Sequence, residues 1–268
     1  MKKFPILLTF LLLSGCAGKY SDSNITLSLG EKRALDVAEQ VSLGYSTGPI
    51  SLSHRKLDLH EIAGHLDMDE ETAKLHLKAT NVHGYYSLIA NNYPPETEFI
   101  LYHIDYERKV NANKTFFVNG NGILITPMDT TYVELESNFL SFSNYLPGEP
   151  IDFVLGSKDG RYFAATRIVP NPIMLKDKNG HLVSVEIASP DRKKYIVSGI
   201  GFEPFGSYML ITQFENERLV HTLQANENGE MFQLTGPTIP WVTGGEASIE
   251  LRGDGIDNLI TFEFQWGK

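Results

Sequence analysis

A serine flanked by two glycines is the first feature of this sequence that could carry chemistry. The spacing G-x-S-x-G occurs in Gly44-Tyr45-Ser46-Thr47-Gly48. In hydrolases, such glycines permit a sharp strand-to-helix turn that exposes the serine hydroxyl as a nucleophile. Residues 49–53, which follow, have an extended pattern instead of a helical one. We therefore expect a glycine-rich turn here, and an envelope hydrolase that uses Ser46 is the alternative interpretation.

Two histidines near residue 60 suggest a zinc site at first sight. His60-Glu61-Ile62-Ala63-Gly64-His65 resembles the H-E-x-x-H motif but has one residue too many. The motif places its histidines four residues apart, about 40° from each other around a helix, whereas a separation of five gives about 140°. Imidazoles that point in such different directions cannot share one ion. We expect a short amphipathic helix and no metal site.

Two groups of carboxylates could bind calcium. The first, residues 67–71, lacks the glycine and the oxygen spacing of a calcium loop, and it fits a helix start with Asp69 as the N-cap. The second group contains Asp254, Asp257 and Asn258. We expect a hairpin turn there, with calcium as the alternative. The sequence thus predicts no cofactor.

Aromatic residues offer possible contacts for a ligand. Tyr85 and Tyr86 begin a run of strand-like residues, and Trp241 follows Pro240 in a segment with the character of a loop. Tyrosine and tryptophan give a large contact area at low entropic cost. We retain these three residues as candidate contacts for a protein or glycan ligand, with core packing as the competing interpretation for the tyrosines.

The only cysteine indicates where the protein resides. Lys2 and Lys3 precede an apolar run, residues 4–13, that is too short to span a bilayer and is typical of an export signal. Leu13-Ser14-Gly15-Cys16 then resembles the lipobox of bacterial lipoproteins. The resemblance implies diacylglycerol on the Cys16 thiol, cleavage before it, and an acyl group such as palmitate on the new amino terminus. Ala17 replaces the aspartate that retains such proteins at the inner membrane, so the resemblance implies the outer membrane.

The charge of the chain limits its partners. Acidic residues outnumber basic ones by 33 to 23, and loss of Lys2 and Lys3 with the signal would change the formal charge from −10 to −12. Such a chain repels nucleic acids and anionic lipid surfaces. We expect no nucleic-acid partner, and we expect contact with a membrane only through the lipid on Cys16.

Short strand-like runs between turns predict a mainly β fold. Asn-Gly and Asp-Gly pairs at residues 121–122, 159–160, 179–180 and 228–229 separate runs of aromatic and branched residues. Two segments of the chain share the same order of features: a turn that begins with Pro, a strand, a hairpin with Gly, and a Gly-Glu turn. In the first segment these features are marked by Pro95, Gly122 and residues 147–150. In the second they are marked by Pro204, Gly229 and residues 244–247. This repeat resembles the Ig-like modules of bacterial envelope proteins.

Together these patterns predict two Ig-like β-sandwich modules in tandem after an N-terminal extension with one or two short helices. We divide the chain into a signal peptide (1–15), a lipidated tether (16–24), an α/β extension packed on the first module (25–79), a first sandwich (80–170) and a second sandwich (171–268). The prolines at 170 and 172 mark the boundary between sandwiches. We expect a lipid-anchored envelope protein with a non-catalytic binding or structural role.

Overall fold

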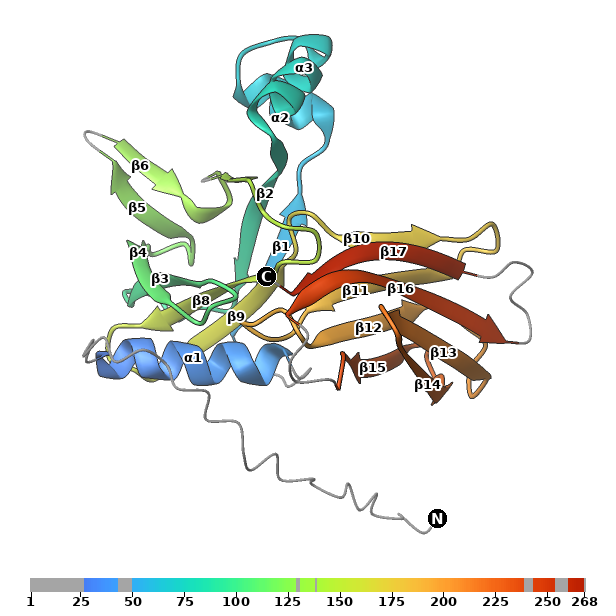
Figure 1. The fold of residues 1–268 in the computed structure, drawn as a ribbon. Helices are drawn as coiled ribbons and strands as arrows, with labels where there is room; N and C mark the ends of the chain where they lie inside the picture. The colour runs from blue at the N-terminus through green and yellow to red at the C-terminus, as the bar shows by residue number, and fades with distance from the viewer. Residues whose placement is uncertain are drawn as a thin grey trace.

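The computed structural model describes residues 27–42, 50–128, 131–137, 139–238, 243–253 and 260–267 (Figure 1). Strands dominate it, and every strand pairing is antiparallel. The predicted mainly β class is confirmed. Among the described residues, no helix is both long enough and apolar enough to cross a membrane.

The elements follow one another in this order: α1 (Leu29–Ser42), β1 (Ser51–Lys56), α2 (Leu59–His65), α3 (Glu70–Thr80), β2 (Val82–Asn91), β3 (Glu98–Ile104), β4 (Val110–Val118), β5 (Leu124–Met128), β6 (Thr131–Glu134), the 3-10 turn η1 (Leu135–Ser137), β7 (Leu140–Ser143), β8 (Ile151–Ser157), β9 (Phe163–Ile168), β10 (Ile173–Lys176), β11 (Leu182–Ile187), β12 (Tyr195–Ile200), β13 (Ser207–Phe214), β14 (Glu217–Gln224), β15 (Met231–Thr235), β16 (Gly244–Gly253) and β17 (Ile260–Gly267).

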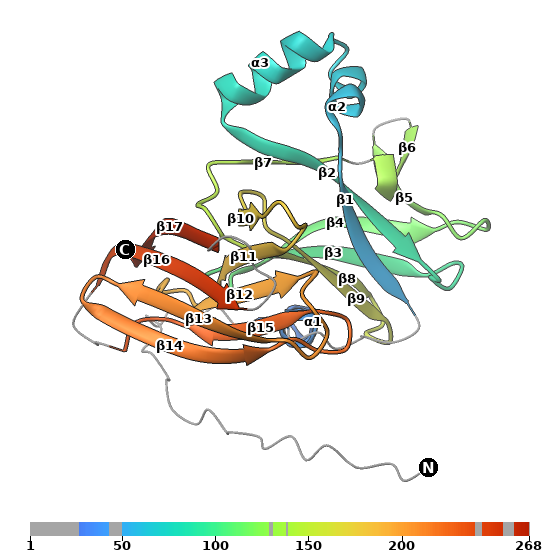
Figure 2. The same ribbon diagram turned by 90° about the vertical axis from the view of Figure 1, so that its right-hand side faces the viewer.

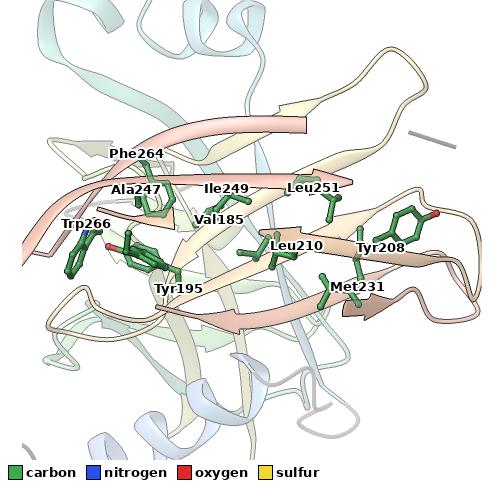
Figure 3. Close-up of a cluster of buried hydrophobic side chains, with 14 of the residues drawn as sticks. Val185, Tyr195, Tyr208, Leu210, Met231, Ala247, Ile249, Leu251, Phe264 and Trp266 are labelled. Atoms are coloured by element: carbon green, nitrogen blue, oxygen red, sulfur yellow. The ribbon is translucent and has the colours of Figure 1, made fainter. Parts of the chain in front are cut away.

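The strands form four sheets that pack in pairs. In the first sandwich, β1-β2-β7 faces the six-stranded sheet β6-β5-β4-β3-β8-β9, and side chains of both sheets fill one apolar core. In the second sandwich, β10-β11-β12-β15 faces β14-β13-β16-β17 over the core shown in Figure 3. Tyr195, Leu210 and Ile249 are at most 1% exposed there. Burial of each such side chain contributes about 1.5–3 kcal/mol.

Both sandwiches have the strand order of an Ig-like fold. With strands lettered as in immunoglobulins, A-B-E corresponds to β1-β2-β7 in the first sandwich and to β11-β12-β15 in the second. The opposite sheet, C′-C-F-G, corresponds to β4-β3-β8-β9 and to β14-β13-β16-β17. The predicted tandem Ig-like modules are therefore confirmed. The predicted extension of residues 25–79 includes β1, which pairs with β2 as the A strand of the first sandwich.

Two helical segments are added to this plan. Helix α1 lies on the outer face of the six-stranded sheet, where its Ala34 and Ala38 are fully buried against Tyr102 and Ile104 (Figure 1). Side chains of β3 alternate regularly, so Tyr102 and Ile104 face the helix while Leu101 faces the sandwich core. The register shift between Leu101 and Tyr102 is a β-bulge in the partner strand β4, where Asn113 is the extra residue.

The second addition, the pair α2 and α3, stands clear of both sandwiches at the end of the β1–β2 ribbon (Figure 2). Asp58 forms a capping box with Glu61 at the start of α2. Asp69 caps α3 and accepts a hydrogen bond from Thr72 N, as the sequence predicted.

Strand β10 sets the orientation of the second sandwich. In an ordinary tandem the modules follow one another head to tail, but here the chain first runs out along β10 and then turns back, so the second sandwich points the opposite way. The chain leaves β9 at Ile168, runs outward along β10, and returns along β11, whose last residue Ile187 donates its N–H to Gly148 O of the first sandwich. The two sandwiches consequently meet through corresponding ends, which we call the junction. The B–C loop and the loop after C′ lie at the opposite, free end of each sandwich: residues 92–97 and 119–123 in the first, and residues 201–206 and 225–230 in the second.

Candidate functional site

The structure places the two candidate tyrosines inside the protein. Tyr86 is 4% exposed and packs edge-on against Phe142 in the first sandwich core. Tyr85, on the opposite face of β2, is 8% exposed and lies in the small core below α2 and α3, near His65. Neither ring therefore offers a surface to a ligand.

Several other predicted site residues lie outside the described residues. They are Cys16, Ser46, Trp241, Asp254, Asp257 and Asn258.

The two histidines of α2 have separate surroundings. His60 Nδ1 lies 3.1 Å from Glu70 Oε1 at the surface, whereas the His65 ring packs edge-on at 4.6 Å from the Phe139 ring. Across the described part of the chain, no group of three or more His, Cys, Asp or Glu side chains is placed to hold a metal ion.

A buried arginine at the junction joins the two sandwiches. Arg167 on β9 makes two hydrogen bonds to Asp152 of β8, from Nε to Oδ1 at 2.7 Å and from a terminal nitrogen to Oδ2 at 2.9 Å. Its other terminal nitrogen donates to Glu186 Oε1 of β11, in the second sandwich, at 2.5 Å. The side chains of Arg167, Asp152 and Glu186 are 19%, 7% and 22% exposed. Burial raises the pKa of the Glu186 carboxyl, and the attraction of Arg167 only partly offsets this effect.

Backbone hydrogen bonds continue this connection. Gly148 N donates to Asn171 O at 2.8 Å, and Gly148 O accepts from Ile187 N at the same distance. The Asn171 side chain donates to Tyr145 O at 3.2 Å. The N–H of Gly148 thus bonds to the linker, and its carbonyl bonds to the second sandwich, so this residue connects the first sandwich to both.

A third contact lies between loops at the junction. Arg192, from the loop after β11, donates to Tyr106 Oη at 2.7 Å and lies 5.2 Å from the centre of the Tyr106 ring. Arg192 O accepts hydrogen bonds from Tyr195 Oη and from Gly267 N. The loop is therefore fixed to its own sandwich while its side chain reaches the other one.

These junction residues share no short sequence motif. Asp152, Arg167 and Glu186 are 15 and 19 residues apart and come from three strands. Asp152 and Arg167 are charged residues inside mainly apolar strands, because β8 and β9 are almost entirely buried, whereas Glu186 lies on the alternating strand β11. Buried charges of opposite sign are usually paired, so a charged residue in such a strand is the one signal that could have indicated the junction.

Comparisons with known proteins give a likeness of fold only. No protein-family model and no curated protein matches this chain. A tetra-tandem repeat from the extending region of a large adhesion protein is 12% identical with a TM-score of 0.24, over 81% of this chain and 48% of that chain, so this chain spans about half its length. Two fibronectin type III domains of chicken tenascin are 11% identical with a TM-score of 0.23, over 69% of this chain and 92% of that chain. A Ca²⁺-stabilized adhesin by which an Antarctic bacterium binds ice is 9% identical with a TM-score of 0.19, over 83% and 74% of the two chains. At these values the likenesses carry no argument about function.

Proposed function

We propose that this protein is a lipid-anchored component of a bacterial cell envelope with a non-catalytic binding or structural role. Its two sandwiches act as one rigid body, and the free end of each sandwich, with its loops, lies away from the junction. The junction is the observation that supports this role most directly. Three connections cross it: the Arg167 ion pairs, the backbone bonds of Gly148 and the contact between Arg192 and Tyr106.

The lipobox supports the anchor. Twelve residues lie between Cys16 and Leu29, the first residue of α1, so thirteen residue-to-residue steps connect the two. A fully extended chain of that length spans about 45 Å. A lipidated Cys16 would therefore hold α1, and the six-stranded sheet on which it packs, within that distance of the membrane. We place the protein at the outer membrane because Ala17 follows the cysteine.

We expect Cys16→Ser to release the protein from the membrane. Without the thiol no diacylglycerol can be attached. Cleavage before residue 16 then fails, and the chain keeps its signal peptide. The measurement is Triton X-114 partitioning together with intact mass of the purified chain. Ser14→Ala serves as a control that keeps the thiol and should still partition into detergent. A Cys16→Ser chain that is cut at the same place, or that still partitions with detergent, would contradict the anchor.

The rigid-body role predicts one narrow distance between the two free ends. Asn121 and Asn228 are exposed and follow the C′ strand of the first and second sandwich. In a Cys16→Ser background, Asn121→Cys and Asn228→Cys allow two spin labels, because Cys16 is the only native cysteine. Double electron–electron resonance should give a single narrow distance distribution. A broad distribution would show that the sandwiches move independently and would contradict the proposed role.

A further inference from the structure

The free end of the second sandwich presents an aromatic side chain on a turn. Residues 203–206 form a β-turn in which Gly206 N donates to Glu203 O at 2.9 Å. Pro204 occupies the second position, and Phe205 occupies the third with φ 62°. Turns with positive φ at the third position normally have Gly or Asn there. Phe205 is nevertheless in this position, and its side chain is 65% exposed.

Hydrogen bonds to neighbouring segments hold this turn rigidly. Phe205 N donates to Ala225 O at 3.1 Å, and Ala225 N donates to Gly206 O at 3.0 Å. Glu203 N donates to the hydroxyl of Tyr208, a residue that is 3% exposed. A backbone in the left-handed region costs a β-carbon residue about 1–2 kcal/mol, and these bonds keep Phe205 there. The backbone that carries the ring is thereby held in one conformation, with the ring in solvent, before any partner binds.

The first sandwich provides an internal comparison. At the corresponding turn Glu96 has φ 58° and is exposed. Glu96 N donates to Val118 O, and Val118 N donates to Thr97 O, both at 3.0 Å, which is the pattern made by Phe205, Gly206 and Ala225. The same backbone geometry thus forms with a charged, solvated side chain. Neither the turn nor the core requires an aromatic ring at this position.

The surroundings of Phe205 indicate what kind of partner would fit. Two of the segments that meet at this end, residues 203–206 and 225–230, contain Glu203, Glu227 and Glu230 and no basic residue. The β10–β11 turn beside residue 201 adds Lys178 and the paired side chains of Asp177 and His181, so acidic residues remain in excess. All three glutamates are exposed. An anionic lipid surface would repel this charge, whereas basic side chains of a protein would complement it. Protein–protein interfaces typically combine an apolar centre that is enriched in aromatic residues with a polar rim.

We propose that Phe205 is the anchor of a protein-docking tip. Its ring inserts into an apolar pocket of a partner protein whose rim carries lysine or arginine, and the three glutamates contact that rim. The inference rests on the proposed binding role and assigns it to one end of the molecule. Because hydrogen bonds already hold the backbone of this turn, little backbone entropy is lost when the partner docks.

The first test measures stability and needs no partner. Phe205→Asn should leave the midpoint of urea unfolding unchanged or raise it, because Asn tolerates the left-handed region better than Phe. The matched change in the first sandwich is Glu96→Asn, which should behave in the same way. A midpoint that falls on Phe205→Asn but not on Glu96→Asn would show that the ring has a structural role, and it would overturn the proposal.

The second test identifies the partner. A photo-crosslinking phenylalanine analogue is placed at Phe205, or at Glu96 as the control, in the full lipidated chain in cells. We expect one protein adduct from position 205 that is absent from position 96. The captured protein, identified by mass spectrometry and purified, should bind the wild-type chain at least about 30-fold more tightly than the Phe205→Ala chain. Its affinity should fall as salt is raised and should not change with Glu96→Ala.

Each other outcome would overturn the proposal. These outcomes are no adduct at position 205, a captured protein whose affinity is unaffected by Phe205→Ala, an adduct with a second copy of this chain, and Phe205-dependent binding to vesicles of phosphatidylethanolamine and phosphatidylglycerol. If membrane release by Cys16→Ser and the narrow distance between the free ends still hold, the docking tip alone is rejected and the proposed function stands.

Discussion

Arg167→Met should lower the free energy of unfolding by about 3–5 kcal/mol, because it leaves the buried Asp152 carboxylate and the half-buried Glu186 carboxylate without their cation. Asp152 and Glu186 are 7% and 22% exposed, and both bond to the Arg167 guanidinium. Methionine fills part of the volume of the arginine stem but neutralises neither charge. Urea unfolding of the wild-type and variant chains at pH 7 measures the difference. The distance distribution between labels at positions 121 and 228 should also broaden, since the triad joins the sandwiches.

The loss should be smaller at pH 5 than at pH 7. In the native protein, burial already raises the pKa of the Glu186 carboxyl, and the charge of Asp152 adds to this rise. A carboxyl whose pKa is higher in the folded than in the unfolded protein favours folding fully when the pH is below its unfolded-state pKa. This favourable contribution to the free energy of unfolding is lost as the pH rises through the folded-state pKa. Removal of the Arg167 charge raises the folded-state pKa of the Glu186 carboxyl further. The loss of unfolding free energy in Arg167→Met is therefore larger at neutral pH, where Glu186 must ionise, than in acid, where it stays protonated.

Two controls separate the triad from general effects. Arg161→Met removes an exposed ion pair in which the Arg161 and Asp159 side chains are 71% and 40% exposed. This change should lower the free energy of unfolding by less than about 1 kcal/mol. The combination of Arg167→Met with Asp152→Asn and Glu186→Gln removes all three charges and should recover most of the stability, because the stranded charges cause the loss. If Arg167→Met costs no more than Arg161→Met, the triad does not hold the junction.

The sequence predicted those features that depend on local patterns. Turn pairs and alternating apolar residues are short-range signals, so the β class and the two Ig-like modules could be predicted. Pro95 and Pro204 both precede a C strand in the structure, and Gly122 and Gly229 both follow a C′ strand. The weak repeat in the sequence therefore corresponds to equivalent loops of the two sandwiches.

Features that depend on distant contacts could not be predicted in the same way. Alternation along β2 places Tyr85 and Tyr86 on opposite faces of the strand, but it does not show that α2 and α3 cover the Tyr85 face while the sandwich core covers the Tyr86 face. Only the three-dimensional arrangement shows that both rings are buried. Likewise, nothing in the residues of β10 shows that this strand reverses the second sandwich, because the reversal depends on the pairing of β11 with β12 and on the bond from Ile187 to Gly148.

Gly229→Ala should lower the free energy of unfolding by about 2–4 kcal/mol, which combines a backbone cost of roughly 1 kcal/mol with a steric cost of about 1–3 kcal/mol. Gly229 has φ 73°. An added β-carbon would lie 2.2 Å from Phe202 O, a backbone atom that cannot rotate away. Gly229 O also accepts a hydrogen bond from Phe202 N at 3.0 Å, and this bond holds the B–C loop against the loop after C′. The measurement is urea unfolding of the two chains.

The repeat supplies the matched control for this prediction. Gly122 follows the C′ strand of the first sandwich with φ 79°, and no atom lies within 4 Å of a β-carbon added there. Gly122→Ala should therefore cost only the backbone term of about 1 kcal/mol. The difference between the two variants isolates the contact with Phe202, because their backbone angles are nearly equal. Equal losses would mean that the two loops of the second sandwich are not clamped together, and the rigid support of Phe205 by these loops would then fail as well.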